Sequence, residues 1–172
     1  MKKIMGIIIA LLSITIFFGW NSQTQTQEPP KLTITIRDKE IQYVTAKIKW
    51  DGELFDMQNT FENILKEGSE IEPQYIEFGE LAVISFENNP PDKFIMSDIL
   101  IDIRGDKKFF TPIISLPLEL NNSTCSFKIV KNIETELDSY WAPNMTYLRG
   151  FRMTACWGEN QCEYDFIIKT DR

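Results

Sequence analysis

Two cysteines near the C-terminus, Cys156 and Cys162, are the side chains whose type and spacing most readily suggest chemistry. They lie in the segment TACWGENQCEY, and the third cysteine of the chain, Cys125, lies further upstream. Such thiols can form a disulfide, bind a metal or remain buried as small apolar groups. Because the chain contains no histidine, the three cysteines do not complete a typical zinc-ligand set, and we predict no metal site.

Alternating apolar and polar residues around these cysteines predict a β-hairpin with one buried face. The apolar residues of both strands share a face when Trp157 lies opposite Cys162, which leaves GENQ as a four-residue loop. In this register Cys162 points inward and Cys156 outward, so a disulfide between them requires a bulge near Gly158. Cys125 is also predicted to point inward, where it either meets Cys162 or remains a buried thiol.

The missing histidine also restricts catalysis, since Ser-His-Asp and Cys-His mechanisms both need an imidazole. Carboxylates remain, and Asp98, Asp102 and Asp106 fall close together in SDILIDIRGD. They could hold calcium, but the regular spacing of a calcium loop is missing and Arg104 supplies a counter-charge. We therefore interpret this stretch as a solvated strand face. No catalytic residue and no cofactor is predicted, which favours a protein without enzymatic activity.

Four aromatic residues form the candidate binding site: Tyr140, Trp141, Tyr147 and Phe151. They flank or lie within WAPNMTYLRG, whose turn-forming residues predict a loop. Exposed rings in a loop can stack on sugars or hold a peptide. The alternative is that some of these rings fill one end of a β-sandwich.

The N-terminus carries a targeting signal in residues 1–20. Lys2 and Lys3 precede an apolar run that is nearly long enough to cross a bilayer, and the lysines predict that the following chain is exported. A clear cleavage site is missing, which favours an uncleaved single-pass anchor over a cleaved signal and a secreted protein. Residues 21–30 read as a polar linker. The formal net charge of −7 argues against a nucleic-acid partner.

Residues 31–172 are predicted to form one extracytoplasmic domain that is mainly β. Short β-rich runs alternate with turn residues at the spacing of an antiparallel sandwich, and we predict an immunoglobulin-like one, with a generic α+β domain as the alternative. The first two runs, 32–37 and 41–50, are predicted to form a hairpin. One short helix is expected between Asp56 and Gly68, because Met57, Phe61, Ile64 and Leu65 share a helical face.

The C-terminal segment RGFRMTACWGENQCEYDFIIKTDR and the stretch FENNPPDKFIMSDIL resemble parts of uncharacterised membrane-anchored or secreted proteins of Gram-positive bacteria. The resemblance spans much of residues 32–172. It implies a location outside the cytoplasm and a sandwich fold, and it assigns no catalytic residue.

These observations predict a non-catalytic domain that is held at the membrane by its N-terminal helix and contacts an unknown protein or cell-envelope partner. The alternative function is a cell-wall ligand-binding protein, or an enzyme that uses carboxylates beside the aromatic loop at 140–151.

Overall fold

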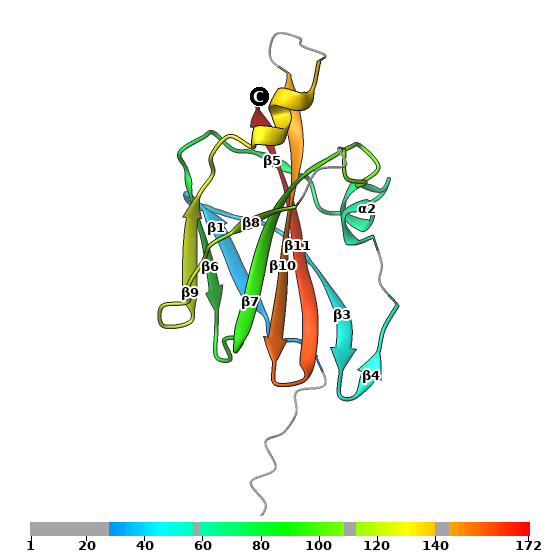
Figure 1. The fold of residues 1–172 in the computed structure, drawn as a ribbon, viewed down its shortest axis with the longest axis vertical. Helices are drawn as coiled ribbons and strands as arrows, with labels where there is room; N and C mark the ends of the chain where they lie inside the picture. Colours follow the sequence, from blue (N-terminus) through cyan, green and yellow to red (C-terminus); the bar gives the residue numbers. More distant parts are fainter. Residues whose placement is uncertain (1–27, 57–58, 109–112, 140–144) are drawn as a thin grey trace, which may run out of the picture.

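The computed structural model describes residues 28–56, 59–108, 113–139 and 145–172, and within them the chain is mainly β (Figure 1). Two sheets pack against each other, with strand orders β2-β1-β6-β9 and β4-β3-β11-β10-β7-β8. Pairing is antiparallel throughout, except that β5 pairs parallel with β11. The prediction of a mainly β fold with two antiparallel sheets and one short helix is confirmed at this level.

The elements in chain order are β1 (Leu32–Ile36), β2 (Lys39–Glu40), β3 (Val44–Trp50), β4 (Glu53–Leu54), α2 (Thr60–Leu65), β5 (Gln74–Tyr75), β6 (Leu81–Phe86), β7 (Lys93–Ile101), β8 (Ile114–Leu116), β9 (Thr124–Lys128), the 3-10 helix η1 (Ile133–Leu137), β10 (Thr146–Trp157) and β11 (Asn160–Asp171).

The main core lies between the two sheets, where alternate side chains of the strands point inward. In β1 the apolar residues of LTITI are buried and its two threonines are half-buried. The long hairpin of β10 and β11 supplies the opposite wall, where the Phe151 and Phe166 rings stack with centroids 5.0 Å apart. Cys125 and Cys162 are buried in the same cluster.

The β10–β11 hairpin has the predicted faces but not the predicted register. Ala155 pairs with Cys162 and Trp157 with Asn160, so the turn is only Gly158 and Glu159. Gly158 has a φ of +57°, as expected of a glycine at the first central position of a type II′ turn. A shift of two residues keeps every side chain on its face, which is why the face prediction is correct while the four-residue loop is wrong.

The predicted hairpin between residues 32–37 and 41–50 is wrong. β1 turns back only into the short β2, after a turn at Arg37 with a φ of +54°, and β3 then crosses to the other sheet to pair with β11. Tyr43 supports the crossing: its hydroxyl donates to the Leu32 carbonyl at 3.0 Å and accepts from the Leu32 N–H at 3.2 Å.

The predicted helix forms as α2 and is shorter than expected. Asn59, not Asp56, is its N-cap, and its side chain accepts a hydrogen bond from the Glu62 N–H. Phe61 and Ile64 are buried against the outer face of the seven-stranded sheet, as the helical pattern predicts. Met57 lies outside the described residues.

Residues 1–20, which are predicted to be a targeting segment, and most of the predicted linker also lie outside the described residues. Among the helices in the described ranges, none combines the length and apolar character of a membrane span.

Candidate functional site

The four aromatic residues of the predicted site are not all at the surface. Tyr147 and Phe151 are 3% and 1% exposed, and Phe151 packs between Phe166 and Phe127 in the core. The Tyr147 hydroxyl donates to Asp138 at 3.2 Å. These two rings are therefore not available to stack on a ligand at the surface. Tyr140 and Trp141 lie outside the described residues, so their part in binding stays a prediction.

The three cysteines are free, which confirms that Cys156 and Cys162 are not bonded to each other. Cys156 is half-buried on one face of the sheet, whereas Cys162 lies in the core. Burial raises the pKa of Cys125 to about 11 and that of Cys162 to about 12. The two core thiols are thus protonated at neutral pH and act as small apolar groups, not as nucleophiles.

Asp98 is not part of a solvated strand face, as the sequence suggested, but belongs to a buried ion pair. It is 4% exposed and lies beside Arg149, which is 1% exposed. The Arg149 Nε donates to Asp98 Oδ1 at 3.2 Å, its Nη2 donates to Oδ2, and its Nη1 donates to the Val130 carbonyl at 2.7 Å. The guanidinium also lies 5.3 Å from the centre of the Phe151 ring. The alternation of residues along one strand cannot distinguish this face from a solvent-exposed one. A charged side chain is buried only when a partner is present, and the partner of Asp98 comes from another strand.

A second ionic cluster holds α2 on the outer face of the seven-stranded sheet. The Arg152 Nε donates to both Asp165 carboxylate oxygens, at 3.3 and 3.0 Å, and lies 3.4 Å from a Glu163 oxygen. The Thr60 hydroxyl donates to Asp165, and the Arg152 guanidinium stacks 4.9 Å from the centre of the Phe61 ring. Burial raises the pKa of both Asp165 and Glu163. These carboxylates therefore serve to attach the helix.

Two small hollows beside α2 have volumes of about 290 and 220 Å³ and share Asp106 in their walls. Its carboxylate accepts from the Asn59 amide at 3.3 Å and lies 3.6 Å from Arg104. The Asp106 carboxylate that the two hollows share therefore already has partners on both sides.

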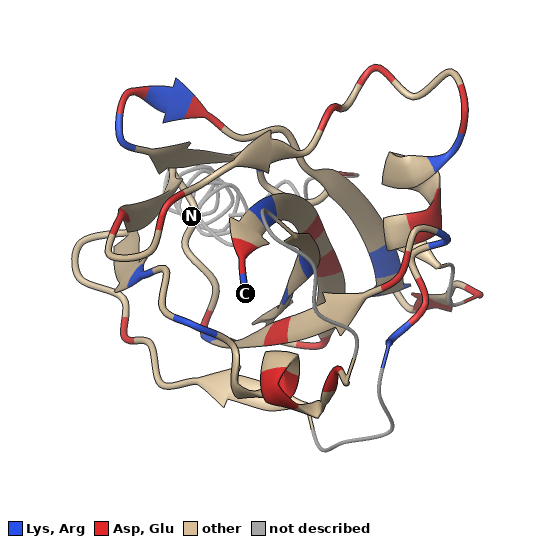
Figure 2. Cartoon of the chain, turned by 90° about the horizontal axis from the view of Figure 1, so that it is seen from above, with Lys and Arg blue, Asp and Glu red and all other residues tan. Residues whose placement is uncertain are grey.

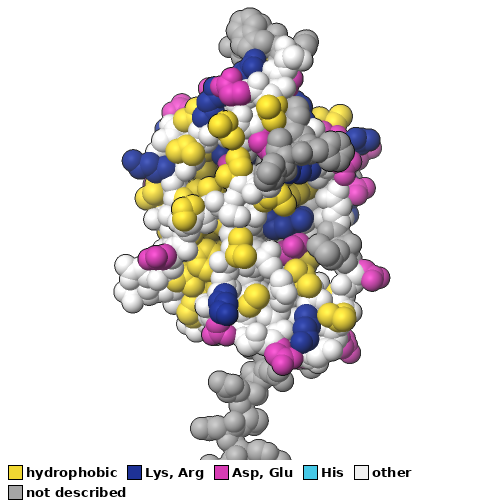
Figure 3. Space-filling model, viewed as in Figure 1, with side chains coloured by type: hydrophobic (Ala, Val, Ile, Leu, Met, Phe, Trp, Pro, Cys, Tyr) yellow, Lys and Arg dark blue, Asp and Glu magenta, His cyan; other side chains and the backbone are white. Residues whose placement is uncertain are grey.

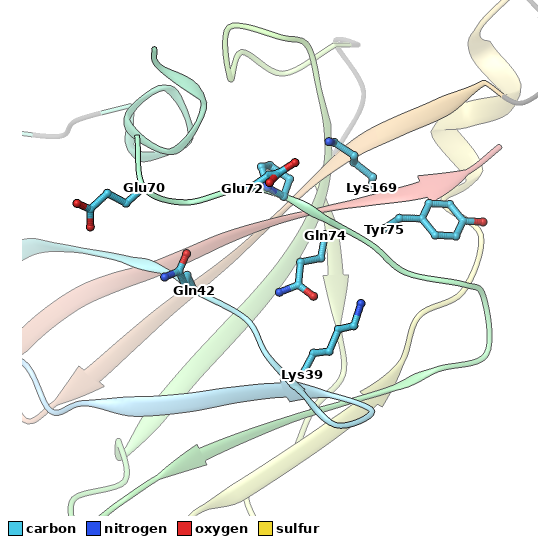
Figure 4. Close-up of a pocket in the computed structure, with 8 residues that line it drawn as sticks. Lys39, Gln42, Glu70, Glu72, Gln74, Tyr75 and Lys169 are labelled. Atoms are coloured by element: carbon cyan, nitrogen blue, oxygen red, sulfur yellow. The ribbon is translucent and has the colours of Figure 1, made fainter. Parts of the chain in front are cut away.

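A larger hollow of about 650 Å³ lies where β2, β5 and the end of β11 meet (Figure 4). We call it the polar hollow, and it is lined by Lys39, Gln42, Glu70, Glu72, Pro73, Gln74, Tyr75 and Lys169. Its volume is in the range of small-ligand sites, although its walls are more polar than is usual. In the view of Figure 4 Glu70 and Gln42 lie to the left, Lys169 lies above with Glu72 near it, Lys39 lies below, and Gln74 lies between the two lysines.

Local turns bring these distant residues together. The tight turn at Arg37 projects Lys39 on β2, and the Ser69 hydroxyl accepts from the Ile71 N–H at 3.2 Å, shaping the acidic connection between α2 and β5. β5 then pairs parallel with the end of β11, which sets Gln74 and Tyr75 beside Lys169. No short motif joins these positions in the sequence. The acidic run in the α2–β5 connection is the only local signal of the site.

The charged groups of the polar hollow are unpaired in the described parts of the chain. Neither lysine and neither glutamate of the hollow forms an ion pair or side-chain hydrogen bond there. At the base, Gln74 Oε1 is buried and accepts no hydrogen bond, while its Nε2 reaches the Glu40 carbonyl at 3.4 Å. Arginines elsewhere, such as Arg149 and Arg152, are held by carboxylates. The hollow therefore offers donors and acceptors that the described fold does not use.

Apolar side chains are exposed in several other places. Ile95 is 60%, Ile133 72% and Ile103 84% exposed. Figure 3 shows that, on the face seen there, apolar side chains are interspersed with polar and charged ones. Single exposed apolar residues of this kind are normal in soluble domains and do not define a site.

Comparison with known proteins gives no match: no protein-family model, no curated protein and no solved structure is similar to this chain.

Proposed function

We propose that this chain is a non-catalytic binding module that acts outside the cytoplasm, in which residues 1–20 anchor an immunoglobulin-like sandwich at the cell membrane. The anchor is supported by Lys2 and Lys3 before the apolar run and by the polar linker at 21–30. A secreted form follows if the N-terminal segment is cleaved. The two packed, mostly antiparallel sheets support the sandwich.

The observation that carries the proposal is the position and composition of the polar hollow. The described chain begins near the β10–β11 turn: Glu28 pairs with Lys47 at 2.9 Å and the Tyr164 hydroxyl donates to the Pro30 carbonyl at 2.5 Å. The C-terminus and β5 lie at the opposite end of the sandwich (Figure 1). The hollow, whose charged groups have no partner among the described residues, thus lies at the end of the domain remote from the start of the described chain.

Binding without catalysis is supported by the roles of the reactive side chains. The buried carboxylates at Asp98 and Asp165 accept from arginines, and the thiols at Cys125 and Cys162 are buried in the core. In Figure 2 segments that carry Lys or Arg are interspersed along the ribbon with segments that carry Asp or Glu, and the formal net charge is −7. That distribution favours a protein or cell-envelope partner over a nucleic acid.

Cell fractionation combined with an envelope-binding assay tests this proposal. Full-length chain should sediment with membranes, be digested by protease added to intact cells, and retain envelope material. The variant K39E/K169E should keep its location and lose the retained material, whereas the matched variant K93E/K128E, with two exposed lysines elsewhere, should keep both. A chain that is protected from protease in intact cells would refute the exported location.

The same assay separates the alternative function, in which the aromatic loop binds a cell-wall ligand or forms part of an enzyme. In that case Y140A/W141A, and not K39E/K169E, should lose the envelope material. Among the described residues, the burial of Tyr147 and Phe151 leaves this alternative without an exposed ring.

A further inference from the structure

We infer that the polar hollow binds an extended, zwitterionic peptide segment, with its carboxylate beside Lys39 and Lys169 and its ammonium beside Glu70. This inference rests on the proposed binding function and adds the chemical class of the ligand. The charged side chains, the amide side chains and the strand edge of the hollow each match a different part of such a peptide.

The charges of the hollow match a ligand with separated charges of both signs. Two lysines and two glutamates line it, so its formal charge is zero, and none has a side-chain partner in the described ranges. In the view of Figure 4 Glu70 lies to the left of both lysines, whereas Glu72 is drawn near Lys169. A polyanion such as a phosphate chain would meet the two carboxylates, whereas a zwitterion places one charge at each side.

The amides between the charged groups match a peptide backbone. Gln74 Oε1 has no donor, and the Gln42 side chain has no hydrogen-bond partner among the described residues. A primary amide both donates and accepts, as the N–H and C=O of a peptide do. A ligand N–H would give the buried Gln74 oxygen the partner that it lacks in the described fold.

β5 also presents an open strand edge beside the hollow. Tyr75 pairs with Lys169, and the Ile76 N–H donates to the Lys169 carbonyl at 2.8 Å. In a parallel ladder this arrangement leaves the N–H and C=O of Tyr75 pointing away from β11. β5 has no other strand neighbour in the described parts of the chain. An extended peptide can add to such an edge through its own backbone, which a sugar cannot do.

The test is a titration of the full-length chain in detergent micelles, followed by ¹⁵N–¹H NMR. The probes are trialanine, trialanine amide, N-acetyl-trialanine and chitotriose. Trialanine should shift the resonances of Gln42, Gln74 and Tyr75 and bind at least about tenfold more tightly than either blocked peptide. K39M/K169M should lower the affinity for trialanine by about tenfold and leave the affinity for trialanine amide unchanged. The reason is that only the free carboxylate of trialanine contacts the two lysines. The matched variant K93M/K128M should bind like the original chain.

Two results would overturn the inference. The first is the absence of shifts in the hollow with trialanine up to about 10 mM, or shifts that K39M/K169M leaves unchanged. The second is binding of chitotriose in the hollow without binding of trialanine, which would assign the site to saccharides. If the envelope assay still depends on Lys39 and Lys169, either result refutes the peptide ligand and leaves the proposed binding function standing. Failure of the inference can therefore be distinguished from failure of the proposed function.

Discussion

Removal of the Arg149 side chain should destabilise the fold strongly, because it leaves the Asp98 carboxylate buried without its partner. Arg149 is 1% exposed and bonds both Asp98 oxygens and the Val130 carbonyl. Breaking a buried pair by removing one partner costs about 3–5 kcal/mol, so R149M should lower the free energy of unfolding by that amount. Replacing both partners with apolar residues of similar volume is often neutral, so R149M/D98L should recover most of the loss.

Urea denaturation of R149M, D98L and R149M/D98L measures the coupling between Arg149 and Asp98. The surface pair Lys49–Glu159, whose side chains are 36% and 88% exposed, is the matched control, and K49M should leave the unfolding midpoint unchanged. The reasoning is refuted if R149M loses less than about 1 kcal/mol, or if R149M/D98L is as unstable as R149M.

Three further predictions follow from the packing and the titration of named groups. A Cβ on Gly150 would lie 2.6 Å from the Phe61 ring, so G150A should cost about 1–3 kcal/mol in urea denaturation, and an unchanged midpoint would place α2 elsewhere. Burial raises the folded-state pKa of Glu163 above its ordinary 4.5, so its contribution to stability is present at acid pH and lost as pH rises through that pKa. E163Q should therefore gain stability relative to the original chain as urea denaturation is repeated from about pH 4 to about pH 8, and the opposite slope would contradict the raised pKa. Cys156 is half-buried while the other two cysteines are buried, so the folded chain should react with one equivalent of thiol reagent at about pH 8, and fast labelling of all three would contradict the register of β10 and β11.

The sequence predicts the features that depend on local periodicity. The core-facing residues of β10 and β11, the inward direction of Cys162 and the helix around Phe61 and Ile64 are read directly from the spacing of apolar residues. The register of the hairpin is not read in this way, because a shift of two residues leaves each face unchanged. The glycine at position 158 carried the missing information, since it permits a two-residue turn.

Features that depend on distant partners could not be predicted. The predicted hairpin of residues 32–37 and 41–50 fails because β3 pairs with β11, which is distant in sequence. The burial of Asp98 depends on Arg149, which lies on another strand. The polar hollow combines side chains from β2, β5 and β11, and none of them belongs to a recognisable motif. Periodicity identifies a face, and only the fold shows which charges meet on it.

Site-specific photo-crosslinking in intact cells tests the proposed binding role of the polar hollow most directly. Benzoylphenylalanine is placed at Gln42 in the hollow or, as a control, at the exposed Ser126 on β9. The expected result is an adduct at position 42 that mass spectrometry identifies as a peptide and that K39E/K169E removes, with no such adduct at position 126. Peptide adducts of equal yield at both positions, or adducts at position 126 alone, would contradict a binding role for the hollow.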